Sequence, residues 1–178
     1  MAAKGLLRVG ISVTTLDPQT SRAMEPRVPG PAARLRVIRQ LSDAGIPVRV
    51  MVSPVVPALT DHELEAILSA AKDAGAVAAS SIVLRLPLEV AALFEDWLND
   101  AYPDRAARVM ARVRELHGGK TYDPAFGKRM TGQGEWAALM QQRFKLAARR
   151  LGLDRRLPDL RNDLFAPPVR VGDQMPLL

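Results

Sequence analysis

The chain has 178 residues and carries 25 Lys and Arg against 19 Asp and Glu, which gives a net charge of +6. It contains no cysteine, so disulfide bonds, thiolate nucleophiles and cysteine-bound metals are excluded within these residues. No apolar run reaches the length of a membrane span and no signal-peptide core follows Met1, so we expect a cytoplasmic protein without a membrane partner.

Residues of the types that usually carry catalysis are scarce. His62 lies in the first turn of a predicted helix, and His117 lies at the end of another. A histidine in the last turn more often meets solvent and the helix dipole than a ligand. Neither a Walker loop nor a G-x-G-x-x-G motif follows a predicted strand, which argues against nucleotide-binding folds of these two types.

The first predicted strand, residues 6–14, has two unlike faces. Residues 2–5 before it have the composition of a last helical turn, so we expect the sequence to open in the middle of a fold. The strand alternates between an apolar and a small or polar set: Leu7, Val9, Ile11 and Val13 against Arg8, Gly10, Ser12 and Thr14. The apolar face should lie under helices. Ser12 and Thr14 would then lie near the carboxyl end, where ligands bind in parallel α/β folds.

A loop and a helix are expected next. Asp17-Pro18 ends the strand, and residues 17–31 should form a loop that contains MEPR at positions 24–27. Loops at the ligand end often carry function, so Glu25 and Arg27 are candidate site residues; a surface ion pair is the alternative interpretation. Residues 32–44 then have helical periodicity, and Gly45 ends the helix.

The second predicted strand repeats the design of the first. Within residues 48–53, valines at every second position alternate with Arg49, Met51 and Ser53. The sequence TDHE then has the form of a capping box, in which Thr60 and Glu63 each satisfy a free amide at the start of a helix. Apolar residues at helical spacing follow as far as residue 74.

The third predicted strand, residues 81–86, also alternates. Its helix-facing set would be Ile82, Leu84 and Leu86, and its other face would carry Ser81, Val83 and Arg85. Because an arginine stays charged, a buried Arg85 would need Glu25, another carboxylate, water or a ligand anion as its partner.

Together these elements predict an α/β fold with three parallel strands, because crossovers of this length join neighbouring parallel strands. One apolar and one mixed face per strand suits a barrel better than an open sheet with helices on both sides. The barrel would place Ser12, Thr14, Ser53 and Arg85 around one cavity. We divide the chain into a half-barrel (1–88), a helical extension (89–151) and an extended tail (152–178).

Four segments in this order resemble the second half of a radical S-adenosylmethionine (SAM) barrel: VGISVTTLDP, MEPR, AGIPVRVMVSPVVPALTDHE and LRLP. The resemblance runs from about residue 2 to residue 151, and the branch it is most similar to is the bacterial group near spore photoproduct lyase. It implies the carboxyl-terminal half of a partial (β/α)6 TIM-like barrel, with the predicted strands as the fourth, fifth and sixth.

The resemblance also implies cofactors and site residues. Family members hold a [4Fe-4S] cluster through C-x-x-x-C-x-x-C, SAM binds the remaining iron, and the resulting 5′-deoxyadenosyl radical abstracts a substrate hydrogen. This chain lacks those cysteines, so we expect it to bind neither cofactor alone and to be inactive by itself. By position, the resemblance assigns Ser12 to the SAM ribose, Thr14, Ser53 and Val55 to the same cofactor, and Glu25, Arg27 and Arg85 to a substrate chamber.

Several alternatives remain open. The expected partner is the amino-terminal half of the barrel, in the same gene or as a separate chain, and self-association through the bare first strand is the alternative. The chain would then be an enzyme fragment or a non-catalytic assembly module. A small α/β domain that binds an anionic metabolite through Arg49 and Arg85 is a third candidate. Nucleic acid is a fourth, weakly supported because 2 Tyr and 2 Trp offer little base stacking.

Overall fold

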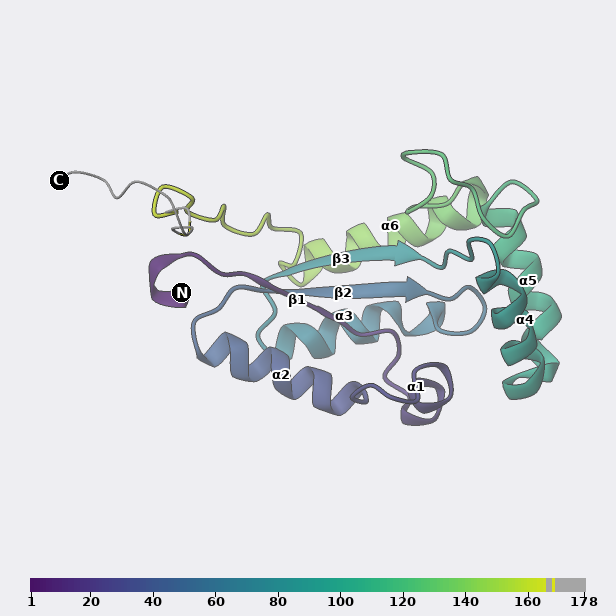
Figure 1. Ribbon diagram of the computed structural model, residues 1–178, viewed down its shortest axis with the longest axis horizontal. Helices are drawn as coiled ribbons and strands as arrows, with labels where there is room; N and C mark the ends of the chain where they lie inside the picture. Colours follow the sequence, from purple (N-terminus) through teal and green to yellow (C-terminus); the bar gives the residue numbers. More distant parts are fainter. Residues whose placement is uncertain (166–167, 169–178) are drawn as a thin grey trace.

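The structure of the protein, a computed structural model, describes residues 1–165 and 168 (Figure 1). Its sheet consists of three parallel strands in the order β1-β2-β3. These strands are β1 (Val9–Ser12), β2 (Val48–Val55) and β3 (Ala78–Val83). The expected three parallel strands are confirmed. In the described part of the chain they form an open sheet, with β1 and β3 as its edges.

Helices cover one face of this sheet. α2 (Pro31–Asp43) joins β1 to β2, α3 (Leu64–Asp73) joins β2 to β3, and α6 (Gly134–Arg150) packs against α3 and β3 (Figure 1). The members of their common core that solvent does not reach are Val13, Ile38, Val50, Ile67, Leu68, Ala71 and Leu153. Among the described helices, none combines the length and the apolar composition that crossing a bilayer requires.

A short helix lies where the sequence predicted only a loop. α1 (Pro18–Met24) begins at Asp17, whose carboxylate accepts hydrogen bonds from Gln19 N at 3.1 Å and from Thr20 N at 2.9 Å. Aspartate at the N-cap with proline at the first helical position is a strong start signal. The loop expected over residues 17–31 is therefore wrong for residues 18–24.

Two further helices lie beyond the carboxyl ends of the strands (Figure 1). They are α4 (Val90–Ala101) and α5 (Pro103–Leu116), which confirms the helices predicted here. With the chain segments that follow β2 and β3 they form a second core, which includes Val56, Leu59, Leu84, Leu86, Leu98, Val109 and Met110. Two single-turn 3-10 helices, η1 (Ala2–Lys4) and η2 (Asp61–Glu63), complete the described secondary structure.

The faces predicted for β3 are reversed. In the register of the sheet, Ser80 lies beside Met51 and Ser81 lies beside Val52. Val83 is 8% exposed and packs against residues of α5 and α6. Ser81 and Val83 therefore face the helices. Residues 78–81 are all small, so they carry no period-two signal from which the correct face could be read.

The two edges of the sheet differ. On the outer edge of β3, Ala79 N donates to Leu153 O at 2.9 Å and Val83 N donates to Met130 O at 3.1 Å. On the outer edge of β1, no described strand pairs with the backbone. One edge is thus capped by the chain itself. The other has no described strand beside it, and of its outward backbone groups the Ser12 carbonyl accepts a hydrogen bond from Arg34 Nη1.

The segment after α6 returns to the start of the chain. Arg8 Nη1 donates to Pro158 O at 3.3 Å, and Arg161 N donates to Gly5 O, also at 3.3 Å. Of the extended tail expected over 152–178, residues 166–167 and 169–178 lie outside the described residues.

Candidate functional site

The face of the sheet opposite the helices carries small and polar side chains. The register places on it Gly10, Ser12, Arg49, Met51, Ala78 and Ser80, and we call these six residues the open face, although Ala78 is itself 1% exposed. For β1 and β2, the faces predicted from alternation are confirmed, because Ile11 and the valines of β2 contact the helices. A Cβ at Gly10 would lie 3.1 Å from Met51 Sδ, a close contact that the flexible methionine side chain would have to relieve.

Directly after β1, the ion pair between Glu25 and Arg34 fixes the backbone segment around Thr14. Thr14 is 3% exposed and donates through Oγ1 to Glu25 Oε2 at 3.0 Å. Arg34 on α2 donates to the same oxygen at 2.8 Å and to Ser12 O at 3.1 Å. Three predicted site residues, Ser12, Thr14 and Glu25, are thus brought together. They fix the loop after α1 against the carboxyl end of β1.

The two arginines predicted to line a chamber do not join this network. Arg27 and Arg85 are both exposed, and neither bonds or ion-pairs with another of the described residues. Arg85 follows the end of β3 by two positions, so solvent hydrates its charge. Of the partners expected for Arg85, Glu25 is not the one it meets, and water is. Arg34, which the sequence did not single out, is the partner of Glu25.

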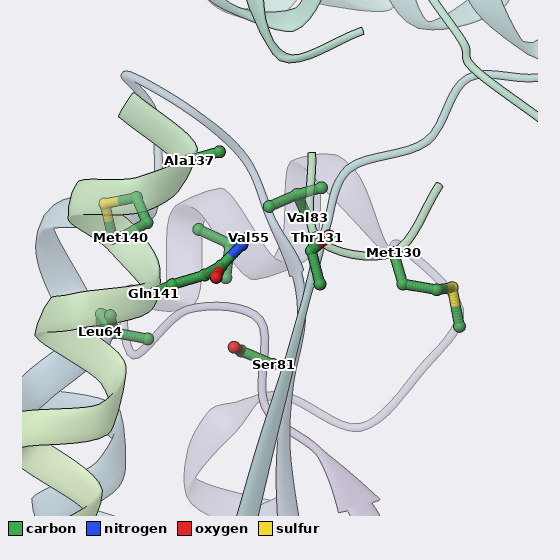
Figure 2. Close-up of a pocket in the computed structure, with 9 residues that line it drawn as sticks. All are labelled: Val55, Leu64, Ser81, Val83, Met130, Thr131, Ala137, Met140 and Gln141. Carbon is green, nitrogen blue, oxygen red and sulfur yellow. The ribbon is translucent and has the colours of Figure 1, made fainter. Parts of the chain in front are cut away.

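Val55 lies on the helix side of β2 rather than on the open face. It is 4% exposed, and the pairing of β2 with β3 shifts between Val52 and Val55. Val55, Leu64 and Met140 line a cavity of about 40 Å³, and Figure 2 shows their side chains. Such a cavity has room for water but not for a nucleoside. The position expected for Val55 is therefore corrected, whereas Ser53 remains half-buried in the carboxyl half of β2.

Glu63 has a different role from the predicted one. Its Oε1 accepts from Thr15 Oγ1 at 2.6 Å, and its Oε2 accepts from Leu16 N at 2.6 Å. Thr60 Oγ1 accepts from Val56 N at 3.0 Å. The predicted capping box is wrong, because both side chains bond to neighbouring segments instead of to each other's amide. Glu63 ties the segments that follow β1 and β2 to each other.

A cleft of about 470 Å³ opens beside this contact. Among the residues that line it are Asp17, Thr20, His62, Glu63, Tyr102 and Arg105. The Thr20 hydroxyl, which donates to Asp17 at 2.6 Å, and the amides of Thr20 and Gln19 hold the pKa of Asp17 below its ordinary value. Asp17 is thus an anion at neutral pH whose oxygens are already engaged. Sequence patterns did not predict this cleft, because its residues come from three distant segments.

The two histidines have contrasting surroundings. His117 is 2% exposed, and its Nε2 lies 3.0 Å from Leu84 O, so the expectation of a solvent-facing side chain is wrong. His62 is exposed at the rim of the cleft. Within residues 1–165 and 168, no group of three His, Cys, Asp or Glu side chains is placed to hold a metal ion.

Comparison with known proteins gives one family match. The radical SAM superfamily model matches residues 1–71, which include β1, β2, α1 and α2. The match supports the superfamily and does not single out the branch near spore photoproduct lyase. It is consistent with a partial TIM-like barrel, whose closure the open sheet does not show.

The similar curated proteins are longer than this chain. Uncharacterized proteins of Mycobacterium tuberculosis and Mycobacterium bovis are each 35% identical over 118 residues, which is 65% of this chain and 34% of theirs. An uncharacterized protein of Acidianus two-tailed virus is 40% identical over 47 residues, 26% of this chain and 16% of its own length. The chain thus spans about a third of the length of its mycobacterial relatives. No solved structure matches it significantly.

Proposed function

We propose that this chain forms the carboxyl-terminal half of a radical SAM barrel, in the branch near spore photoproduct lyase. The observation that carries the proposal is the open face, which ends in Ser12 at the carboxyl end of β1 inside the matched residues 1–71. Ligands of parallel α/β folds bind at this end of the strands. In this role the open face is the inner wall of a chamber that a second half closes.

The proposal gives each site residue a distinct task. We assign the Ser12 hydroxyl to the SAM ribose, with Ser53 on the neighbouring strand. Thr14, Glu25 and Arg34 position the loop that carries Arg27 at the mouth of the chamber. Arg85 stands in solvent after β3, where it is available to a substrate anion.

The [4Fe-4S] cluster of the superfamily does not fit the residues of this chain. The cluster is bound by thiolates, and the sequence has no cysteine. In the proposed enzyme the cysteines belong to the other half of the barrel. A second candidate function, a non-catalytic assembly module, is supported by the bare edge of β1, because such an edge recruits another strand.

Anaerobic reconstitution with iron and sulfide tests the proposal. The chain is reconstituted alone and together with the polypeptide encoded directly upstream, and SAM cleavage is followed as released 5′-deoxyadenosine. Cluster absorption and 5′-deoxyadenosine in the mixture, with Ser12→Ala reducing the product, support the enzyme half. A stable complex that cleaves no SAM supports the assembly module. Absence of a complex contradicts both.

A further inference from the structure

The open face carries a single charge, the guanidinium of Arg49. Val48 and Val50 on either side of it are 1% and 0% exposed under the helices, so Arg49 points to the opposite side of the central strand. Its neighbours in the register are Gly10 on β1 and Ala78 on β3. Arg49 is therefore flanked by the two smallest amino acids, glycine and alanine.

Arg49 is half-buried, and one nitrogen of its guanidinium, Nε, lacks an acceptor. Arg49 Nε is shielded from solvent and has no hydrogen-bond partner. Across residues 1–165 and 168, none of the Arg49 nitrogens forms an ion pair. Arginine cannot give up its proton, and a shielded donor without an acceptor costs free energy, so such a group calls for an explanation.

The sheet itself cannot supply the acceptor. The other members of the open face are Gly10, Ser12, Met51, Ala78 and Ser80, and none of them is acidic. A carboxylate or phosphate that meets Arg49 must approach from above the open face. Its planar fork of donors suits a bidentate contact with such an anion.

The position of Arg49 along β2 distinguishes two sources of this anion, a bound ligand and a protein side chain. Ligands of parallel α/β folds lie outside the carboxyl ends of the strands. Arg49 is the second residue of β2. It lies about 13 Å from Ser53 along the strand, at 3.3 Å for each residue. A charge at the amino end of the strands is placed to meet a protein side chain rather than a bound ligand.

We propose that Arg49 forms an internal ion pair with an Asp or Glu side chain of the polypeptide that covers the open face. The inference rests on the proposed function, which takes this polypeptide to be the other half of the barrel. The bare edge of β1 and the 34% coverage of the mycobacterial relatives both leave room for such a polypeptide. The ion pair would close the amino end of the chamber and set the register between the halves.

The test compares one substitution in two states of the protein. Arg49→Met keeps most of the side-chain stem and removes the charge, Arg49→Lys keeps the charge without the fork, and Arg36→Met alters an exposed arginine of α2 as the control. Melting temperature is measured for the chain alone, and affinity for the upstream polypeptide is measured by calorimetry. Circular dichroism confirms that each variant is folded.

We expect Arg49→Met to leave the melting temperature of the chain alone unchanged or higher, because it removes an unpaired donor. It should weaken binding of the upstream polypeptide by on the order of 30-fold, because it leaves a buried carboxylate without its partner. Arg49→Lys should lie between wild type and Arg49→Met, and Arg36→Met should change neither quantity.

Two results would overturn the ion pair. One is a complex that forms and cleaves SAM but binds Arg49→Met as tightly as wild type, which leaves the proposed function intact. The other is a rise in melting temperature of the chain alone with inorganic phosphate or acetate that Arg49→Met abolishes, which assigns the site to a free anion. If the wild-type chain does not bind the upstream polypeptide, the proposed function fails together with this inference.

Discussion

The two edges of the sheet differ in what covers them. At β3, the carbonyl groups of Leu153 and Met130 accept hydrogen bonds from the outer edge, and the same chain supplies both. At β1, no described strand pairs with the outer edge. A row of unpaired amides and carbonyls is a template for further pairing, so proteins cap such edges where pairing has to stop. The comparison is the basis for our proposal that this sheet ends at β3 and continues at β1 in another polypeptide.

The two faces show the same division. The helix side is filled with valines and leucines that solvent does not reach, whereas the open face carries hydroxyls, a thioether and one guanidinium. Burial of apolar side chains gives the helix side its stability. The open face has little of this kind to contribute, which agrees with our proposal that another polypeptide covers it.

The largest loss of stability is expected from a substitution at the capped edge of the sheet, beside β3. Leu153 is fully buried in the core and its carbonyl bonds to β3. Leu153→Ala should lower the free energy of unfolding by about 3 kcal/mol, because it removes buried apolar volume and leaves a cavity. Urea unfolding measures this loss. Leu160→Ala, at a side chain 44% exposed, is the control and should change stability by less than about 0.5 kcal/mol.

The next effect concerns the contact that fixes the segment after β1. Glu63→Gln should cost about 1 to 2 kcal/mol, because a neutral amide replaces a carboxylate that accepts two short hydrogen bonds. Thr15→Val removes one donor and allows a double-mutant cycle. The two substitutions should be coupled by more than about 0.5 kcal/mol. Strict additivity in urea unfolding would show that the contact does not hold the two segments together.

A smaller loss of stability is expected at low pH, from the ion pair between Glu65 and Arg143 at the interface between α3 and α6. Arg143 donates to both oxygens of Glu65, at 2.8 and 2.6 Å, and thereby lowers the Glu65 pKa from its ordinary value. The folded state therefore favours the carboxylate. The stability that this pair adds is complete above the ordinary pKa and disappears as the pH falls through the lowered pKa.

Urea unfolding between pH 7 and pH 3 measures this loss. Glu65→Gln should be less stable at neutral pH and should show a shallower decline in acid. Glu115→Gln, which breaks an exposed pair with 42% and 40% exposed partners, is the control and should keep the wild-type decline. An unchanged acid profile for Glu65→Gln would show that the pair contributes nothing.

The regular part of the fold could be predicted from the sequence, and the reasons are physical. In β1 and β2, alternation of valine and isoleucine with polar residues gives both the strand and its buried face. The same signal is absent from β3, where residues 78–81 are all small, and its faces were reversed. Asp17-Pro18 carried a helix start signal that also fits the end of a strand, so α1 was missed.

The site was predictable only where a residue belongs to a regular strand. Ser12 lies where alternation places it, at the end of β1. The pairing of Glu25 with Arg34 and of Glu63 with Thr15 depends on how separate segments approach each other. No local pattern encodes such contacts. The local pattern around Glu63 predicted a capping box, but Glu63 bonds to Thr15 and Leu16 from a distant segment instead.

Hydrogen–deuterium exchange at the amides of Gly10 and Ser12 tests most directly whether the bare edge of β1 receives another strand. These amides alternate with those of β1 that bond to β2, so they point to the outer edge. In the chain alone they should exchange rapidly. In a mixture with the upstream polypeptide, exchange at both should slow by at least an order of magnitude, while the amides of β3 stay as they were. Exchange at Gly10 and Ser12 that remains fast in a formed complex would contradict strand pairing at this edge.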